Sequence, residues 1–185
     1  QIQLDTLNAN NRKVLESFTH EISTLSELDH KNIVQYLGFE NEQNYLNIFL
    51  EYIPGGSLAH KVNTEGPLSE KVAKHFVFQC LEGLQYLHSK GIIHRDIKGA
   101  NILVDTNNVA KISDFGLSRQ EEKFNNRQSM KGTVYWMAPE VAKPDGSITT
   151  KVDIWSLGCL IVELVTGNHP FPNLEAMQAL YQIGT

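Results

Sequence analysis

A predicted hairpin constrains the fold of this chain more than any other feature. Two short stretches, Ile-Leu-Val at 102–104 and Ala-Lys-Ile-Ser at 110–113, flank the turn-forming run 105–108 (Asp-Thr-Asn-Asn), which is typical of two short antiparallel strands. Both stretches lie between Asn101 and Asp114, which are thirteen positions apart in the sequence (114 − 101). The hairpin therefore predicts that Asp114 returns to lie beside Asn101.

Three oxygen-bearing side chains, those of Asp96, Asn101 and Asp114, have the spacing that phosphoryl transfer requires. That reaction needs metal ions held against phosphates, an in-line nucleophile and a carboxylate that takes the hydroxyl proton. We expect Asp96 to orient and deprotonate a substrate hydroxyl. We expect Asn101 and Asp114 to bind Mg²⁺, which prefers oxygen ligands. The alternative is structural, with these residues serving only as loop caps and turn formers.

Three motifs in order resemble the eukaryotic protein kinase family. They are His-Arg-Asp followed by Asn at 94–101, Asp-Phe-Gly at 114–116 and Ala-Pro-Glu at 138–140. One such motif would be weak evidence, but all three in sequence are strong evidence. The resemblance implies an α+β, two-lobe protein-kinase-like fold, with ATP and Mg²⁺ as cofactors and a protein as the substrate.

The composition is that of a globular, acidic chain. Hydrophobic residues make up 41% and charged residues 20% of the 185 residues, and the net charge is −5. This charge argues against a general nucleic-acid-binding role, which usually needs a basic face. The two cysteines, Cys80 and Cys159, lie in apolar helical patterns. They are interpreted as reduced thiols, which favours a cytoplasmic setting.

We expect neither a signal peptide nor a membrane span. Residues 1–20 contain no apolar run. The most apolar stretch, 152–165, is too short to cross a bilayer and includes Asp153 and Glu163. That stretch is therefore predicted to be a buried helix, with Trp155 and Leu157 among its buried side chains.

The chain is predicted to be one partial kinase domain. It carries neither a glycine-rich G-x-G-x-x-G loop nor a V-A-I-K strand lysine, which the resembled family has upstream of the first helix seen here. Residues 1–53 are expected to be the remainder of the N-lobe, lacking its first strands. Residues 54–185 are expected to be the C-lobe with the catalytic and activation loops, lacking its last helices. We expect these 185 residues alone to have little activity.

The predicted N-lobe contains a helix and two strands. Apolar residues spaced by three and four predict a helix over 11–28, and β-branched and aromatic residues predict strands over 33–39 and 45–53 with a polar turn at 40–44. The resemblance implies that Glu21 on this helix pairs with the strand lysine that aligns the ATP phosphates. On its own, Glu21 would be interpreted as a solvated helix carboxylate.

The resemblance places an adenine pocket at the junction of the lobes. Backbone groups of Glu51 and Ile53 would bond the adenine, Leu50 would stand at the back of the pocket, and Leu103 would form its floor. An ordinary strand-to-helix turn at Pro54-Gly-Gly56 is the alternative, and Leu103 suits a plain core position equally well.

The C-lobe is predicted to consist mainly of helices. Ser57 is expected to cap a short helix, and Ser69 a longer one that ends at Gly91. Cys80 and His88 on the longer helix are interpreted as packing and helix-end residues. The resemblance implies that Asp153 bonds the catalytic-loop backbone, and a further helix is predicted over 175–183.

The segment from Asp114 to Glu140 is long and mostly polar, which is typical of a functional loop. The resemblance identifies it as an activation loop with Ser129 as a phosphorylation site, and Ser118 as a weaker candidate. A phosphate there would add roughly −1.5 to −2 charge and would order the loop against Arg95 and Arg119. The alternative is that Ser129 is a plain exposed loop serine.

Two residues indicate the class of kinase. Lys98 is typical of serine/threonine kinases, where it contacts the transferred phosphate, and Thr133 would brace Asp96 and Lys98. The runs 28–38, 52–58, 94–105 and 132–140 further resemble mitogen-activated protein kinase kinase kinases, and the runs 34–41 and 152–159 look most like the fungal cell-wall-integrity type. The resemblance implies that the substrate is another protein kinase and that an upstream kinase is a possible activator.

Two other functions compete with an active kinase. A pseudokinase scaffold is disfavoured by the intact Asp96, Asn101 and Asp114, but the missing lysine and glycine loop leave it open. A small-molecule phosphotransferase is disfavoured by residues 133–140, which resemble a peptide-docking segment. Upstream sequence would separate the first alternative from a kinase, and a screen of peptide against metabolite substrates would separate the second.

Overall fold

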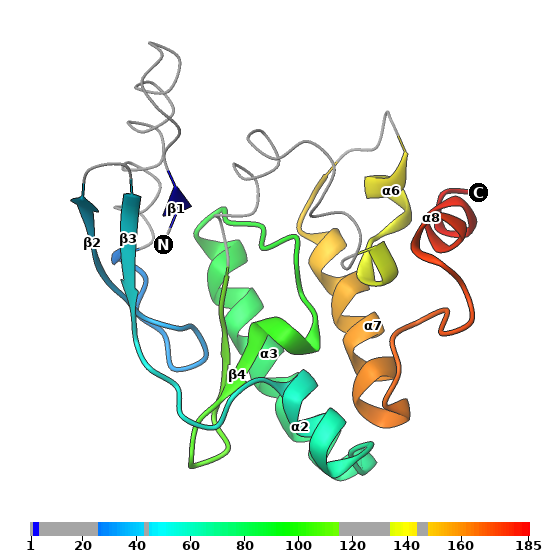
Figure 1. Cartoon of the computed structure of the whole chain (residues 1–185), viewed down its shortest axis with the longest axis horizontal. Helices are drawn as coiled ribbons and strands as arrows, with labels where there is room; N and C mark the ends of the chain where they lie inside the picture. The colour runs from blue at the N-terminus through cyan, green and yellow to red at the C-terminus, as the bar shows by residue number, and fades with distance from the viewer. Residues whose placement is uncertain (1, 4–25, 43–44, 115–133, 144–147) are drawn as a thin grey trace.

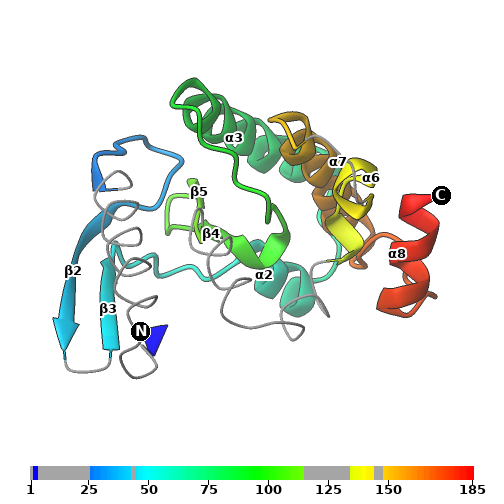
Figure 2. The same ribbon diagram turned by 90° about the horizontal axis from the view of Figure 1, so that it is seen from above.

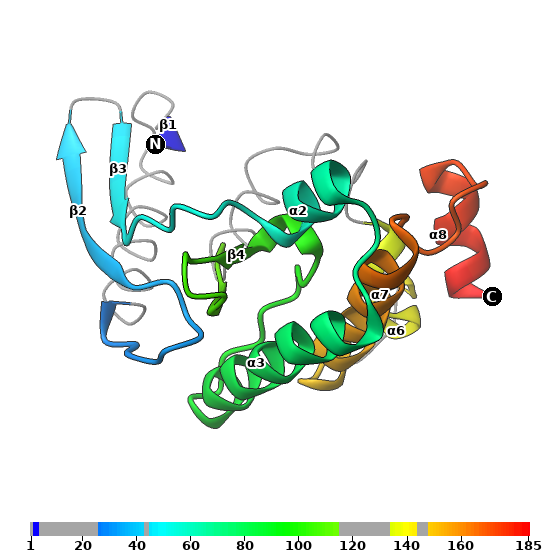
Figure 3. The same cartoon turned by 90° about the horizontal axis from the view of Figure 1, so that it is seen from below.

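The chain folds into a small antiparallel sheet that stands beside a body of helices (Figure 1). A computed structural model describes residues 2–3, 26–42, 45–114, 134–143 and 148–185. The extended link 51–57 leads from the sheet to the helices and is clearest from below (Figure 3).

The sheet contains β1 (Ile2–Gln3), β2 (Tyr36–Glu42) and β3 (Tyr45–Leu50) in the order β1-β3-β2, and both pairings are antiparallel. The predicted polar turn at 40–44 is wrong in part, because residues 40–42 continue β2 in register with β3. The backbone pairing between β2 and β3 thus continues past the apolar residues of β2 into the polar residues 40–42.

The strand predicted from Ile33 also begins later than expected, at Tyr36. Ile33 forms a parallel bridge with Ile112, and the Val34 N–H donates to the Ile112 carbonyl at 2.9 Å. This short stretch is therefore attached to the helical body rather than to the sheet. A pairing partner so distant in sequence could not be read from local β propensity.

The helical body is built on α2 (Leu58–Glu65), α3 (Glu70–Ser89) and α7 (Lys151–Thr166). The Ser57 hydroxyl accepts from the His60 N–H at 3.1 Å, which confirms the predicted cap. Ser69 occupies the N-cap position of α3, but its side chain makes no capping bond. Gly91 takes a φ of 74°, a left-handed conformation that favours glycine, and the chain turns there after α3 ends.

The predicted hairpin is confirmed. β4 (Ile102–Val104) pairs antiparallel with β5 (Ala110–Ile112), directly after the short 3₁₀ helix η1 (Gly99–Asn101). The Asp105 carboxylate accepts two backbone N–H groups of the connecting turn, each at 2.8 Å. These bonds explain why the run 105–108 turns where it does.

A single apolar cluster joins α2, α3, α7 and the hairpin. Its largest members that are almost fully buried are Phe76, Ile33, Leu58, Leu84, Leu87, Ile97, Ile102, Ile112 and Leu160. Cys80, at 1% exposed, belongs to this cluster, which confirms its predicted packing role. Ile97 before η1 and Ile102 after it are both members of this cluster, which therefore anchors the chain on either side of η1.

The prediction that α7 is buried all round is wrong. Leu157 is 4% exposed as expected, but Trp155 is 44% exposed. The buried positions of α7 recur every three or four residues and so form one face. Among the described elements, α2, α3, η1 and the short 3₁₀ helix η2 (Val134–Trp136) contact that helix. Composition revealed that the helix is apolar but not which side its neighbours cover.

The C-terminal part forms a smaller unit beside α7 (Figure 2). It contains η2 (Val134–Trp136), α6 (Pro139–Ala142) and α8 (Ala176–Gly184), and the last confirms the predicted helix near 175–183. Val134, Ala179 and Ile183 form its buried core. Within the described residues, no helix combines the length and apolarity needed to cross a membrane.

Candidate active site

The catalytic loop begins where the chain leaves α3, and one buried carboxylate holds its backbone. Asp153 on α7 is 0% exposed and accepts from the His94 N–H at 2.9 Å and from the Arg95 N–H at 2.8 Å. The predicted bond between Asp153 and this backbone is therefore present. Arg95 has a φ of 68°, a conformation that costs a non-glycine residue free energy and that these bonds help to maintain.

His88 also contacts Asp153, which sequence reasoning missed. Its Nε2 lies 2.7 Å from Asp153 Oδ2, so the histidine does more than end α3. The only sequence signal was an imidazole in the last turn of a helix, which is common and has a simple explanation in the helix dipole. The contact joins residues 65 positions apart in sequence.

His94 is buried and connects the two halves of the site. Its Nδ1 accepts from the Asp96 N–H at 3.1 Å, so Nε2 carries the proton and donates to the Ser113 carbonyl at 2.9 Å. Burial lowers the pKa of His94, against the opposing influence of that hydrogen bond and of nearby carboxylates, among them Asp114. A neutral imidazole therefore holds Asp96 relative to the hairpin that leads to Asp114.

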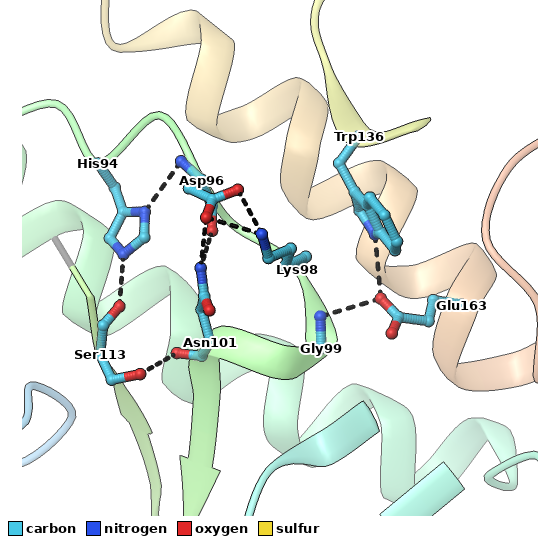
Figure 4. A network of polar contacts seen from close by, with 8 residues as sticks. All are labelled: His94, Asp96, Lys98, Gly99, Asn101, Ser113, Trp136 and Glu163. Atoms are coloured by element: carbon cyan, nitrogen blue, oxygen red, sulfur yellow. Dashed lines mark hydrogen bonds and ion pairs between the residues drawn. The ribbon is translucent and has the colours of Figure 1, made fainter. Parts of the chain in front are cut away.

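Asp96, Lys98 and Asn101 converge as the sequence predicts (Figure 4). Lys98 Nζ lies 3.0 and 2.8 Å from the two carboxylate oxygens of Asp96. Asn101 Nδ2 donates to the Asp96 carbonyl and to its Oδ2, both at 2.8 Å. The Asp96 side chain is 18% exposed, so its oxygens are oriented by the protein yet accessible from solvent.

The hairpin brings Asp114 to the same place. Ser113 donates to the Asn101 carbonyl through both its N–H, at 2.9 Å, and its hydroxyl, at 3.0 Å. Asp114 follows directly, with an exposed side chain and a φ of 58°. Asn101 and Asp114 are thus neighbours across η1 and the end of the hairpin.

The residues present fit a magnesium ion. The amide nitrogen of Asn101 is occupied by Asp96, which leaves the amide oxygen as its free metal-binding group. With the exposed Asp114 carboxylate, this makes two oxygen donors, and Mg²⁺ bound to nucleotide phosphates usually has few protein ligands. Among the described residues, no cluster of three or more His, Cys, Asp or Glu forms a metal site of another kind.

The predicted adenine-binding residues lie where the sheet meets the helices. Leu50 ends β3 and packs against the core, Ile53 is buried, and Leu103 lies half-buried on β4. The Glu51 N–H donates to the Gln35 carbonyl at 2.9 Å, so the Glu51 carbonyl is the group of that residue left for a ligand.

The Glu51 side chain makes an ion pair that sequence reasoning missed. Its carboxylate lies 2.8 Å from Lys111 Nζ on β5 and also accepts from the Gln35 N–H at 3.0 Å. Burial raises the pKa of Glu51, but the bonds from Lys111 and Gln35 outweigh it and lower the pKa overall. The pair connects the end of the sheet to the hairpin.

Glu163 on α7 was noted from sequence only as a charge within an apolar stretch. It is 9% exposed, and its Oε2 accepts from the Gly99 N–H at 2.9 Å and from Trp136 Nε1 at 3.0 Å (Figure 4). Burial raises the pKa of this carboxyl, although the two hydrogen bonds oppose the change. A carboxylate among apolar residues was the one available signal.

Four of the predicted site residues lie outside the described residues. They are Glu21, Arg119, Ser129 and Thr133. Most of the predicted helix over 11–28 lies outside them too. Arg95, the other predicted regulatory residue, lies in the catalytic loop.

The family described as protein kinase domain matches residues 3–184. The chain is 52% identical over 186 residues to the mitogen-activated protein kinase kinase kinase MST11 of Pyricularia oryzae, covering 96% of this chain and 20% of that protein. It is 50% identical over 178 residues to the serine/threonine-protein kinase STE11 of Saccharomyces cerevisiae, covering 94% and 25%.

A third relative, the serine/threonine-protein kinase BCK1/SLK1/SSP31 of Saccharomyces cerevisiae, is 46% identical over 189 residues, covering 100% of this chain and 13% of that protein. The chain thus spans a quarter or less of the length of these relatives. Among solved structures, Rad53 1-466 in complex with AMP-PNP superposes with a TM-score of 0.77 at 34% identity, covering 94% of this chain and 44% of that one.

Proposed function

Because this chain belongs to the protein kinase domain family and resembles fungal mitogen-activated protein kinase kinase kinases, we propose that its protein transfers the γ-phosphoryl group of ATP to another protein kinase. The acceptor is a serine or threonine hydroxyl of a downstream mitogen-activated protein kinase kinase. The observation that carries this proposal is the convergence of Asp96, Lys98 and Asn101 beside Asp114.

Asp96 orients the substrate hydroxyl and accepts its proton. Two donors, Asn101 Nδ2 and Lys98 Nζ, hold its carboxylate, and His94 holds its backbone N–H. Such positioning converts a bimolecular encounter into a reaction between fixed groups. Lys98 stabilises the negative charge on the transferred phosphoryl group as a mobile point charge, which its place beside Asp96 allows.

Asn101 and Asp114 would hold Mg²⁺ through their side-chain oxygens. When bound, the ion neutralises charge on the phosphate oxygens and orients the nucleotide. In this chain, the Asp96–Asn101 bonds turn the Asn101 amide oxygen toward that role, and the Ser113 bonds fix the approach of Asp114. The adenine pocket is formed by Leu50, Glu51, Ile53 and Leu103. Glu21 aligns the phosphates through a lysine.

The domain is α+β with two lobes, present here in part. The sheet beside the helical body supports a division at 53–54 into an N-lobe and a C-lobe (Figure 1). We assign regulation to phosphorylation of Ser129, with Arg95 and Arg119 as the cationic partners of the phosphate and Thr133 bracing Asp96. An upstream kinase is the proposed activator, and the cell-wall-integrity branch the proposed pathway type.

We place this protein in the cytoplasm on the character of its cysteines. Cys80 and Cys159 are both free. Burial raises the pKa of Cys80 to about 12 and that of Cys159 to about 11, so both remain thiols at neutral pH. Reduced thiols are usual in that compartment.

The test is phosphorylation of a catalytically inactive mitogen-activated protein kinase kinase by the complete protein with ATP and Mg²⁺. We expect phosphate on a serine or threonine of the substrate, and none with the Asp96→Asn variant. The matched control is Asp29→Asn, an exposed position outside the site. Equal labelling by the wild-type and Asp96→Asn proteins would show that the site does not catalyse the transfer.

A further inference from the structure

The link 51–57 pairs with the hairpin as it approaches α2. The Val104 N–H donates to the Gly56 carbonyl at 2.8 Å, and Ser57 forms an antiparallel bridge with Leu103. β4 therefore has two partners, because it pairs with β5 and also with the end of the link. Leu103, the proposed floor of the adenine pocket, lies within this pairing, so its position depends on the link as well as on the hairpin.

The start of the link is bonded to the same hairpin. The Glu51 carboxylate lies 2.8 Å from Lys111 Nζ, and Lys111 is the residue of β5 that pairs with Leu103. Because the Glu51 N–H donates to the Gln35 carbonyl, the Glu51 carbonyl is left for a ligand. The link and the hairpin thus form a closed frame. This frame contains the proposed adenine-binding residues Glu51 and Ile53 as well as Leu103.

Gly55 lets the link approach the hairpin more closely than a residue with a side chain would. A Cβ atom at this position would collide with the Val104 carbonyl oxygen, and it would lie 3.1 Å from the Val104 carbonyl carbon and 3.4 Å from the Asp105 carbonyl oxygen. All three are backbone atoms, so they cannot turn aside as the end of a flexible side chain can. A side chain at position 55 therefore requires the link or β4 to move.

Gly56 has a different requirement, which is its conformation. Its φ is 72°, in the left-handed region that favours glycine. A Cβ atom here would meet only the end of the His60 side chain, at 3.6 Å. Gly55 is therefore needed for space, whereas Gly56 is needed for the turn that presents its carbonyl to Val104.

We propose that Gly55 is a positioning residue that sets the distance between the adenine-binding edge of the link and Leu103, and that it thereby makes the site prefer adenine to guanine. This inference rests on the proposed ATP-dependent function. A carbonyl such as that of Glu51 only accepts hydrogen bonds, so it bonds the 6-amino group of adenine and repels the 6-oxo group of guanine. The discrimination depends on hydrogen-bonding distance, and a link displaced from β4 does not keep the base there.

The experiment uses the complete protein and measures the binding of Mg·ATP and of Mg·GTP by titration calorimetry, without a protein substrate. Gly55→Ala displaces the link, and its matched control is Gly158→Ala on α7. Gly158 is exposed within the helix, and a Cβ atom added there would have nothing within 4 Å. Hydrogen exchange of the peptide covering 103–105 is measured in the same proteins, because the Val104 N–H is protected by the Gly56 carbonyl.

We expect Gly55→Ala to raise the Kd for Mg·ATP about five- to tenfold, as the weakening of one hydrogen bond would. We expect the preference for ATP over GTP to fall by about threefold or more, because the lost contact is the one that distinguishes the two bases. Exchange at 103–105 should be faster in Gly55→Ala, and Gly158→Ala should match the wild type in all three measurements.

Three results would overturn the inference about Gly55. One is unchanged exchange at 103–105, since the link would not have moved. Another is a displaced link with an unchanged ATP preference. The third is an equal loss of affinity for ATP and GTP, which would indicate general damage to the site. A wild-type protein that binds no ATP would instead overturn the proposed function, so the two failures are distinguishable.

Gly56 decides the question if Gly55→Ala does not fold. Gly56→Ala strains the left-handed turn, whereas Gly56→Asn is tolerated better, because asparagine adopts this conformation more readily. We expect the ATP-over-GTP preference to fall about twofold in Gly56→Ala, and to fall less in Gly56→Asn, since backbone strain of this kind costs of order 1 kcal/mol. The same preference in the wild type and both variants would overturn the inference.

Kinetics with a protein substrate separate positioning of the base from an effect on the transfer step. The bonds that hold Asp96 come from Lys98, Asn101 and His94 and do not involve the link. We therefore expect Gly55→Ala to raise KM for ATP and to leave kcat within about twofold of the wild type. A fall in kcat with an unchanged KM would place the effect of Gly55 in the catalytic loop and would overturn the inference.

Discussion

The catalytic loop and the sheet are attached to the helical body by contacts of different kinds. The loop is held by Asp153, which is 0% exposed, and by His94, which is 1% exposed. The ion pairs of the segments that flank the sheet lie nearer the surface, while Tyr36 and Leu50 of the sheet itself pack against the apolar core. In the Glu51–Lys111 pair the side chains are 30% and 16% exposed, and in the Lys31–Glu82 pair they are 31% for Glu82 and 64% for Lys31.

This difference indicates where the molecule is rigid. A buried N–H or carboxylate that loses its partner has no water to replace it, so breaking the contact costs the full desolvation penalty. Exposed ion pairs exchange with water and contribute little. The geometry that the proposed phosphoryl transfer requires is therefore strongly fixed, whereas the Glu51–Lys111 pair between the sheet and the hairpin is a weaker polar contact.

The largest effect is expected from Asp153→Ala. The substitution leaves the buried N–H groups of His94 and Arg95 without their acceptor and removes the partner of His88. We expect the free energy of unfolding to fall by about 3–5 kcal/mol, as for other broken buried pairs, and activity to be lost. Urea unfolding measures the change, with the exposed Asp29→Ala as control. A loss below about 1 kcal/mol would show that the loop is not held as described.

The next largest effects are expected from substitutions of two carboxylates of the site, and these effects differ in kind. Asp96→Asn is expected to lower kcat by about 10²–10⁴-fold, the usual contribution of a general base, with ATP affinity nearly unchanged. Asp114→Asn is expected instead to raise the magnesium concentration needed for half-maximal rate, because it removes a proposed metal ligand. Magnesium titrations of both variants test this difference. The same response in both would contradict the assigned roles.

A smaller effect concerns the pH dependence of stability. Burial lowers the pKa of His94 from its ordinary value of 6.5, although Asp153, Asp96 and Asp114 oppose this. Between the two values the unfolded chain binds more protons than the folded chain, so the free energy of unfolding decreases as pH falls below about 6.5, by at most about 1.4 kcal/mol per pH unit. His94→Gln should reduce this slope, whereas the exposed His60→Gln should not. Parallel slopes for wild type and His94→Gln would contradict the prediction.

The smallest loss of stability is expected from breaking the ion pairs of the segments that flank the sheet. Lys111→Met removes the partly buried pair with Glu51, and Lys31→Met removes the exposed pair with Glu82. We expect losses in unfolding free energy of about 1 kcal/mol or less for both, with the larger at Lys111. Chemical denaturation measures both. A loss at Lys111 as large as that at Asp153 would remove the distinction between a rigid loop and a weakly attached sheet.

The sequence by itself determined the features that depend on neighbouring residues. Turn-forming residues at 105–108 predicted the hairpin, Ser57 predicted the start of α2, and the spacing of Asp96 and Asn101 predicted their convergence. Each of these rests on bonds within a few positions of the chain, where backbone geometry and side-chain type leave few alternatives.

Only the tertiary structure decided which distant groups meet. The partner of Ile33 on β5, the exposed side of α7 at Trp155, the bond from His88 to Asp153 and the two bonds of Glu163 were not predicted. Asp153 and His88 are 65 positions apart, and Glu163 and Gly99 are 64 apart. Such contacts depend on how whole helices pack, because a helix presents several faces of similar composition and its neighbours determine which one is buried.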